Sequence, residues 1–152
     1  MNTQSTINQI LELKTIAVVG FSPKPERPSH YVSMYMKEKG YTIYPVNPGH
    51  REIEDRKCYS NLLEIPFDVD IVNVFRRPEY VLPIAKSTIK ISAKVLWLQD
   101  GVINEEAAQL AEEAGLMVVM NDCVLRQHQN LILLHSQLSE FHSLLNEIFL
   151  AF

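Results

Sequence analysis

The chain has 152 residues, a formal net charge of −4 and 47% hydrophobic residues. This length and hydrophobicity suit one folded domain over residues 1–152 and exclude wholesale disorder. The negative charge argues against a general nucleic-acid binder, which usually carries a basic stripe. Two cysteines without a CxxC motif argue against a disulfide framework and against a zinc site.

Neither a secretory signal nor a membrane span is expected. The N-terminus, MNTQSTINQILELK, lacks a basic start and a long apolar core. No apolar run approaches about 18 residues, the length that a membrane span needs. We therefore expect a cytoplasmic protein with no membrane partner.

Apolar periodicity and turn residues divide the chain into alternating strands and helices. Strand 15–20 is a continuous apolar run, as expected for a parallel strand covered on both faces. The N-terminal segment 1–13 carries a short amphipathic helix capped by Ser5 or Thr6. The expected strands are 15–20, 42–46, 69–75, 94–98 and 116–120, and the expected helices are 5–13, 28–39, 61–64, 78–91, 104–114 and 131–152.

Strands that alternate with helices at short spacing indicate right-handed crossovers and a parallel sheet. We therefore predict an α/β fold with three layers, a Rossmann-like arrangement around a five-stranded parallel sheet. The loops that follow the strands share one edge of such a sheet, where these folds bind ligands. A loop with Cys123, Arg126 and His128 is expected before the last helix.

The stretch KTIAVVGFSPKPERPS, residues 14–29, has the order strand, loop and helix start. Gly20 ends the strand, Lys24 and Arg27 lie in the loop, and Pro28 suits the first helical position. Unpaired backbone N–H groups and the helix dipole favour an anion at such a site. The loop has one glycine and is not GxGxxG, which argues against ordinary dinucleotide binding. We interpret it as a phosphate site.

The loops after the other strands carry further candidates. Asn47 stands where an NAD site usually has an acidic residue for the ribose hydroxyls. An amide there would not repel a ribose phosphate, which both coenzyme A and NADP carry. Arg76 and Arg77 follow the third strand and could hold an anion. The alternative interpretations are a simple turn at Asn47 and solvated surface charge at Lys24 and Arg27. Of the two adjacent arginines, one could bind the ligand while the other meets solvent or Glu79.

The sequence shows no nucleophile paired with a base. Cys58 and Cys123 are interpreted as small buried hydrophobes, the common role of a free cysteine. Ser22 has no evident histidine partner, and the spacing of Cys123 and His128 guarantees no contact. No residue pattern indicates a metal site. We expect a binding protein without catalysis of its own.

The tail has apolar residues at alternating spacings of four and three, which predicts an amphipathic helix over 131–152. These residues are Leu134, Leu138, Phe141, Leu145, Ile148 and Phe152, with Leu131, Leu144 and Phe149 widening the stripe. We expect the helix to pack on the flank of the sheet. Its apolar last turns also make it a candidate surface for a homodimer.

Taken in order, TIAVVGFSPKPERPS, YPVNP, DIVNVFRRPE, WLQDGVINEEAA and GLMVVMNDC…H resemble the small stand-alone CoA-binding proteins. These are similar to the N-terminal CoA-binding domain of the succinyl-CoA synthetase α subunit. The resemblance covers residues 14–131 and implies a Rossmann-like fold. It implies phosphate contacts from the first loop, adenosine contacts from 46–48, and contacts with the pantetheine arm from Gln99 and Gly101. The candidate ligand-binding residues are Gly20, Phe21, Ser22, Lys24, Arg27, Pro28, Val46, Asn47, Pro48, Phe75, Arg76, Arg77, Gln99 and Gly101.

The sequence departs from the family in two places. Val124 stands where the family commonly has a proline after the late cysteine, so the loop 122–128 is expected to differ. The helix beyond His135 passes the usual end of the family. The synthetase reaction uses a histidine of a separate ligase domain and is not carried over. The predicted function is binding of CoA or a short acyl-CoA; the alternatives are an NAD(P)-binding oxidoreductase and a regulatory subunit.

Overall fold

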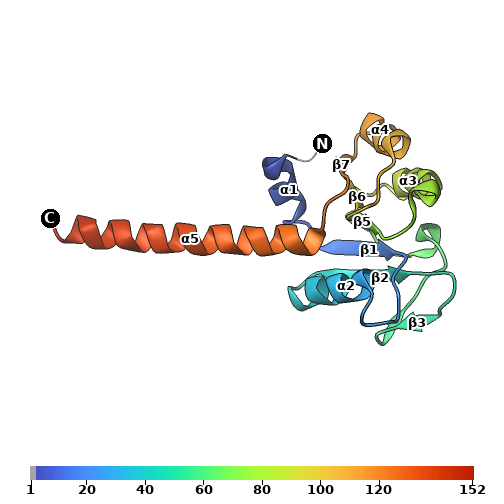
Figure 1. Cartoon of the computed structure of the whole chain (residues 1–152), viewed down its shortest axis with the longest axis horizontal. Coiled ribbons are helices and arrows are strands. Elements are labelled where there is room, and N and C mark those ends of the chain that lie inside the picture. The colour runs from blue at the N-terminus through green and yellow to red at the C-terminus, as the bar shows by residue number, and fades with distance from the viewer. Residues whose placement is uncertain (1–2) are drawn as a thin grey trace.

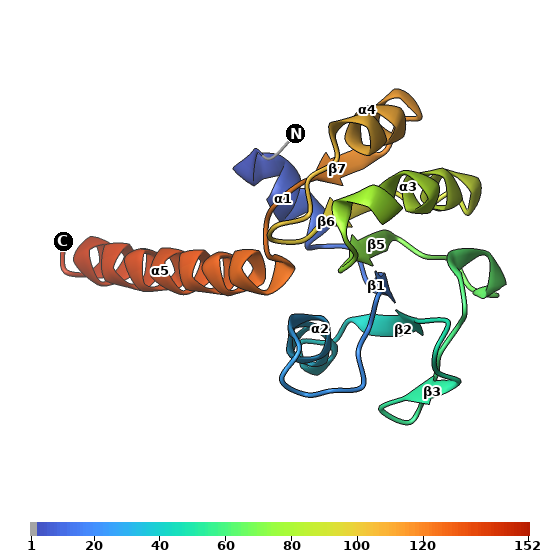
Figure 2. The same cartoon turned by 45° about the vertical axis from the view of Figure 1, so that its right-hand side comes forward.

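In the computed structural model, residues 3–152 are described, and they form a parallel sheet with helices on both faces (Figures 1 and 2). The sheet has five strands in the order β2-β1-β5-β6-β7, and every neighbouring pair is parallel. Its strands are β1 (Thr15–Val19), β2 (Thr42–Val46), β5 (Ile71–Val74), β6 (Val95–Leu98) and β7 (Met117–Val119). The predicted Rossmann-like α/β fold is confirmed.

Two hydrophobic clusters, one on each face of the sheet, make up the core. The first packs α1 (Gln4–Ile10), α2 (Pro28–Glu38) and the start of α5 (Val124–Leu150) against the sheet. The second packs α3 (Val81–Lys90) and α4 (Glu105–Glu113) against the opposite face. Strands β5 and β6 are buried along their whole length, as expected for parallel strands covered on both sides.

Most helix boundaries follow the expected end signals. Pro28 opens α2, and Asn104 caps α4 by accepting a hydrogen bond from the backbone N–H of Ala107. The expected cap of the first helix is wrong, because Thr3, one turn earlier, accepts the bond from the N–H of Thr6. The short helix expected near 61–64 is the 3₁₀ helix η1 (Leu62–Glu64).

The segment between β2 and β5 contains a small hairpin that periodicity did not predict. Strands β3 (Glu52–Ile53) and β4 (Arg56–Lys57) pair antiparallel across a turn in which Glu54 and Asp55 have positive φ. Strands of two residues carry no alternation to detect. A second 3₁₀ helix, η2 (Pro78–Tyr80), precedes α3 and takes up the first turn of the helix expected over 78–91.

The last helix differs most from expectation. It begins at Val124 and not near residue 131, so the loop expected to hold Arg126 and His128 is helical. It also does not lie on the flank of the sheet: α5 projects away from the sheet as a single straight rod (Figure 1). Within residues 3–152, no helix combines the length and apolar character that a membrane span requires.

Candidate functional site

A pocket of about 700 Å³ opens at the carboxyl edge of the sheet, above the point where the strand order reverses between β1 and β5. Ligands of open α/β sheets bind at such a switch point, and the volume lies in the range of small-molecule sites. The residues predicted for the site that line the pocket are Gly20, Ser22, Lys24, Arg27, Pro28, Phe75, Arg76, Arg77, Gln99 and Gly101.

Gly20 lets the first loop cross close to the end of β5. Its φ is +88°, and a Cβ atom at this position would lie 2.4 Å from the carbonyl oxygen of Phe75. Both conditions require glycine. The loop after β1 therefore passes close to the loop after β5, and Arg76 lines the same pocket as the first loop.

The loop between Gly20 and α2 is held by hydrogen bonds to the first turn of that helix. The Ser22 N–H donates to the Ser29 hydroxyl over 3.0 Å, and the Lys24 N–H donates to the Ser22 hydroxyl over 3.2 Å. The buried ring of His30 bonds the Ser22 carbonyl through Nδ1 at 2.8 Å. These bonds fix the loop against the first turn of α2.

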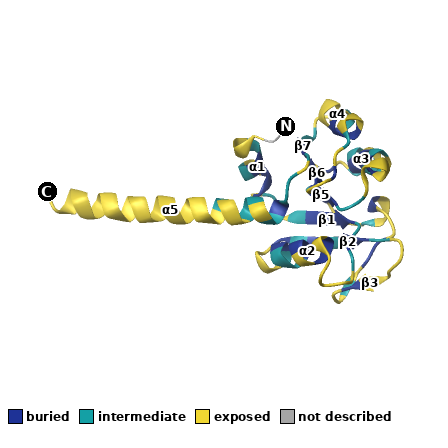
Figure 3. Ribbon diagram, viewed as in Figure 1, coloured by how far each residue is buried: buried dark blue, intermediate teal, exposed yellow. Residues whose placement is uncertain are grey.

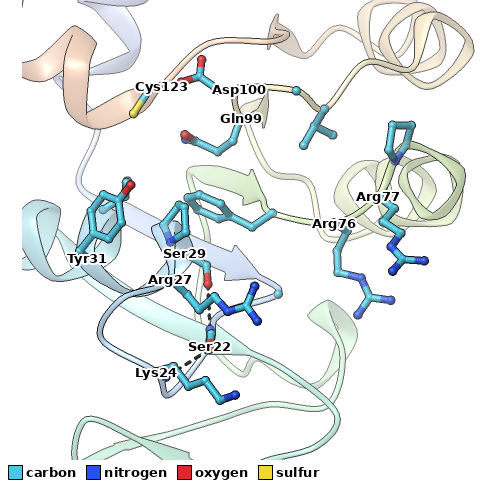
Figure 4. Close-up of a pocket in the computed structure, with 17 residues that line it drawn as sticks. Ser22, Lys24, Arg27, Ser29, Tyr31, Arg76, Arg77, Gln99, Asp100 and Cys123 are labelled. Carbon is cyan, nitrogen blue, oxygen red and sulfur yellow. Dashed lines mark hydrogen bonds between the residues drawn. The ribbon is translucent and has the colours of Figure 1, made fainter.

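Four cationic side chains surround the pocket from two directions. Lys24 and Arg27 come from the first loop, while Arg76 and Arg77 come from the loop after β5 (Figure 4). Arg27 is the N-cap residue of α2, and among the described residues its side chain makes no capping bond. Backbone donors at a helix start together with arginine and lysine side chains favour a phosphate-bearing ligand.

A second hollow of about 270 Å³ adjoins the first across Gly20 and Arg76, which line both. Val46 and Pro48, predicted to contact an adenosine, lie on its wall. The hollow is largely apolar. The guanidinium of Arg76 lies over the ring of Tyr80, 4.7 Å from its centroid, so a planar cation stands at the boundary between the two hollows.

Two predicted residues lie behind the pocket wall. The ring of Phe21 is buried in the core, 1% exposed, so only its backbone can face a ligand. The Asn47 amide donates to the Phe21 carbonyl over 2.9 Å and accepts from the Gly49 N–H over 2.9 Å. Asn47 therefore joins the loop after β2 to the first loop, and its contact with a ligand stays a prediction.

The far end of the pocket is formed by the loops after β6 and β7. Gln99 is buried and donates to the side chain of Asn73 over 2.7 Å. Asp100 receives two bonds of 2.9 Å from Arg126 of α5. These bonds hold the pKa of the Asp100 carboxyl below its usual range. The Asp100 carboxylate is ionised but paired, which limits its repulsion of an anionic ligand.

Seven lining residues were not among the predicted site residues: Ser29, Tyr31, Val32, Pro78, Asp100, Val102 and Cys123. Asp100 lies between two residues that were predicted, and Cys123 follows β7 at the same sheet edge. The rule that strand ends share one edge would have found both. Val102 also lies in the loop after β6. Tyr31 and Val32 of α2 carry no comparable signal, because the side of a helix that faces a pocket is set by the angle at which the helix packs.

Cys58, Cys123 and His128 lie in different surroundings. Cys58 is buried, and burial raises the pKa of its thiol, which fits the interpretation as a small hydrophobe. Cys123 is half-buried and borders the pocket as the N-cap residue of α5. His128 bonds the Tyr35 hydroxyl over 2.9 Å on α2. Among residues 3–152, no group of three or more acidic, cysteine or histidine side chains is placed to hold a metal ion.

Comparison with known proteins gives one consistent family. A sequence profile described as "CoA binding domain" matches residues 14–129. The chain is 44% identical over 127 residues to the Bacillus subtilis protein YneT, which covers 83% of this chain and 94% of that protein. It is 28% identical over 122 residues to an ADP-forming acetate–CoA ligase of Archaeoglobus fulgidus, covering 73% of this chain but 18% of the ligase.

Solved structures agree. A protein from Pyrococcus horikoshii superposes with a TM-score of 0.84 at 43% identity, covering 86% of this chain and 93% of that one. A Thermus thermophilus protein superposes with a TM-score of 0.81 at 34% identity, covering 86% and 99%. The profile spans the pocket loops and ends near the base of α5. On this evidence the chain belongs to the CoA-binding domain family.

Proposed function

We propose that this protein binds coenzyme A, or a short acyl-CoA, across the two adjoining hollows, and that it does so without catalysing a reaction by itself. The observation that carries the proposal is the convergence of Lys24, Arg27 and Arg76 around Gly20, where the two hollows meet. CoA has a phosphate-rich centre between an aromatic base and a long arm, and this site has cations between two unlike cavities.

The proposal assigns one part of the ligand to each part of the site. The adenosine half occupies the apolar hollow beside Val46 and Pro48. The phosphates lie against the first loop and the start of α2, where Lys24 and Arg27 neutralise them. The pantetheine arm extends along the larger pocket toward Gln99 and Gly101. Its thiol end would then lie on the side of the pocket that Cys123 borders (Figure 4).

The first loop favours CoA over an ordinary dinucleotide. A Rossmann dinucleotide site uses a second and a third glycine for the pyrophosphate and for helix packing. Here the first loop has prolines in place of the second and third glycines. Hydrogen bonds of Ser22 with Ser29 and His30 hold this loop. Asn47 leaves the end of β2 without a carboxylate that would repel a ribose phosphate. A cytoplasmic location, a small nucleotide ligand and a single binding domain over residues 1–152 belong to the same proposal.

Isothermal titration calorimetry with CoA, dephospho-CoA, NADP and NAD tests this function. We expect CoA to bind most tightly and dephospho-CoA more weakly, because the latter lacks the ribose phosphate. The double variant Lys24→Glu/Arg27→Glu should weaken CoA binding by roughly 100-fold or more, since two charge-assisted contacts become repulsive. Lys90→Glu on α3, an exposed residue outside both hollows, is the matched control and should bind as the wild type does.

Binding of NADP with no response to CoA at millimolar concentration would refute the proposal and favour the oxidoreductase alternative. A regulatory subunit with an inactive site would bind none of the four nucleotides. We do not propose ligase activity for this chain, because the segment that matches the archaeal ligase is 18% of that protein's length.

A further inference from the structure

The outer part of α5 is exposed on all sides. Every residue from 132 to 152 is exposed, although this segment is rich in leucine, isoleucine and phenylalanine (Figure 3). The large apolar side chains exposed there are Ile132, Leu133, Leu134, Leu138, Phe141, Leu144, Leu145, Ile148, Phe149, Leu150 and Phe152. On the rest of the described chain the exposed large hydrophobics are scattered: Tyr31, Leu63, Phe67, Tyr80 and Ile103. A concentrated apolar surface of this kind marks an interaction site.

Six of these side chains form one regular stripe, which we name the α5 seam: Leu134, Leu138, Phe141, Leu145, Ile148 and Phe152. Their spacing of four, three, four, three and four residues is the a/d repeat of a coiled coil. Leu131 continues the same register toward the domain and packs against the core. The sequence repeat therefore starts at the folded domain and continues to Phe152, two residues beyond the end of α5 at Leu150.

The exposed area is large enough for a stable contact. The helix has 27 residues and is about 40 Å long at 1.5 Å per residue. The seam and its neighbours Leu144 and Phe149 are between 43% and 107% exposed. Together they offer on the order of 1,000 Å² of apolar surface per chain, and a stable interface buries about 800 Å² per partner.

The charges on α5 favour another protein helix over a membrane surface. Residues 132–152 contain Glu140 and Glu147 but neither lysine nor arginine. A helix that lies in a membrane interface typically carries lysine and arginine on its polar face, where they attract anionic lipid. Two carboxylates on a chain of net charge −4 give the opposite sign. An apolar a/d seam is typical of helix–helix packing.

The positions that border the seam suit an identical helix. In a coiled coil, the e and g residues of facing helices meet and decide which partners pair. Here those positions hold His135, Gln137, His142, Leu144, Phe149 and Ala151, none of which is acidic or carries a lysine or arginine charge. Glu140 and Glu147 lie at outward c positions. A second copy thus meets a complementary apolar stripe without like-charge repulsion.

We propose that this protein self-associates by pairing the α5 seam with the α5 seam of a second copy. The pairing is isologous, as in most homo-oligomers. It leaves the ligand pocket open, because the seam residues from Leu134 onward line neither hollow. The inference does not rest on CoA binding, and each can fail without the other.

Sedimentation equilibrium of the full chain at micromolar concentrations tests the pairing. We expect the wild type to have twice the mass of one chain, or a higher whole multiple. The double variant Leu138→Glu/Leu145→Glu places carboxylates at two a positions and should have the mass of one chain. The matched control, Ser136→Glu/Ser143→Glu, adds the same charges at outward f positions and should keep the wild-type mass.

The substituted positions are exposed, so all variants should fold; an unchanged cooperative thermal transition at low concentration checks this. A wild type with the mass of one chain would overturn the proposal. So would equal masses for the seam variant and the wild type. Sedimentation of a monomeric wild type with vesicles of phosphatidylcholine and phosphatidylglycerol would assign the seam to a membrane surface and also overturn it.

Discussion

The carboxyl edge of the sheet and the outer part of α5 both present side chains to solvent, but in different ways. At the sheet edge, polar groups are bound to one another: Ser22 to Ser29, Asn47 to Phe21 and Gln99 to Asn73. On α5, residues 132–152 expose a regular apolar stripe. The edge combines hydrogen-bonded polar groups with apolar walls in two hollows, whereas the outer helix has a simple shape and one continuous apolar area.

This difference separates two kinds of recognition. A pocket with a few fixed polar groups selects a small ligand by the position of individual donors and charges. A long apolar helix gains affinity from buried area, and its specificity depends on register and border charges. In one chain, the selectivity of the pocket thus depends on the positions of individual atoms, and the affinity of the helix depends on the periodicity of its apolar residues. Substitutions in the two regions should therefore have different consequences.

The largest expected contrast is between a core leucine and a seam leucine. Leu96 of β6 is fully buried, so Leu96→Ala removes packed methyl groups and leaves a cavity. We expect it to lower the free energy of unfolding by about 3 kcal/mol. Leu138→Ala should change the unfolding of the separate chain by less than about 0.5 kcal/mol, because the side chain is 48% exposed and lies outside the domain core.

Urea unfolding at several protein concentrations measures this contrast. If copies pair through α5, the effect of Leu138→Ala grows with protein concentration, because association stabilises the folded chain by mass action. The effect of Leu96→Ala should stay nearly constant over the same range. A concentration-independent loss for Leu138→Ala as large as that for Leu96→Ala would show that α5 belongs to the core.

The next effect concerns Gly20, where the shape of the pocket edge depends on one missing Cβ. In Gly20→Ala the new Cβ would meet the Phe75 carbonyl at 2.4 Å, at a φ of +88°. We expect a loss of about 2–3 kcal/mol in unfolding free energy, of which about 1 kcal/mol is the cost of a left-handed alanine. CoA binding should weaken as well, because the first loop must move.

Gly115→Ala provides the matched control for this substitution. Gly115 has a φ of +90°, but a Cβ atom added there would have nothing within 4 Å. It should lose only the roughly 1 kcal/mol of backbone strain. Chemical denaturation of both variants isolates the clash as the difference between them. Equal losses of unfolding free energy in the two variants would mean that a side chain at Gly20 fits between the first loop and the loop after β5.

The sequence predicted the parts of this molecule that follow local rules. Buried parallel strands are apolar throughout, and Pro28 and Asn104 are helix-start signals that act within one turn. Because strand ends share one edge, four loops could be assigned to one site before any contact was known. Ten of the fourteen predicted site residues line the larger pocket, and Val46 and Pro48 line the adjoining hollow.

The errors come from contacts that are distant in sequence. The helix α5 starts at Val124 because that side chain is buried against the sheet and Arg126 bonds Asp100 and Asp122. Neither contact can be read from periodicity. The apolar stripe of α5 was correctly identified, but periodicity alone does not state what covers it. Phe21 and Asn47 were placed by their loops, while the direction of each side chain depends on tertiary packing.

The smallest expected effect is a pH dependence at the base of α5, where His128 joins the helix to α2. Burial, together with the nearby Lys39, lowers the pKa of His128 below its ordinary value of 6.5. The unfolded chain therefore takes up the proton first as the pH falls, so the unfolding free energy should decrease below about pH 6.5 and be full above it. The groups that face His128 are Tyr35, Tyr41 and Lys39. Glu12, Lys14 and His135 line a small surface hollow that His128 also borders, away from the ligand pocket.

Thermal unfolding between pH 5.5 and 7.5 (roughly one unit on either side of the ordinary histidine pKa) measures this effect. His128→Asn keeps a polar group beside the Tyr35 hydroxyl but cannot take up a proton, so its melting temperature should fall less on acidification than that of the wild type. His50→Asn, at an exposed turn, is the control and should retain the wild-type slope. Identical slopes for all three proteins would show that proton uptake by His128 does not affect stability, and that the contact between α2 and α5 depends on its packing and on the hydrogen bond to Tyr35.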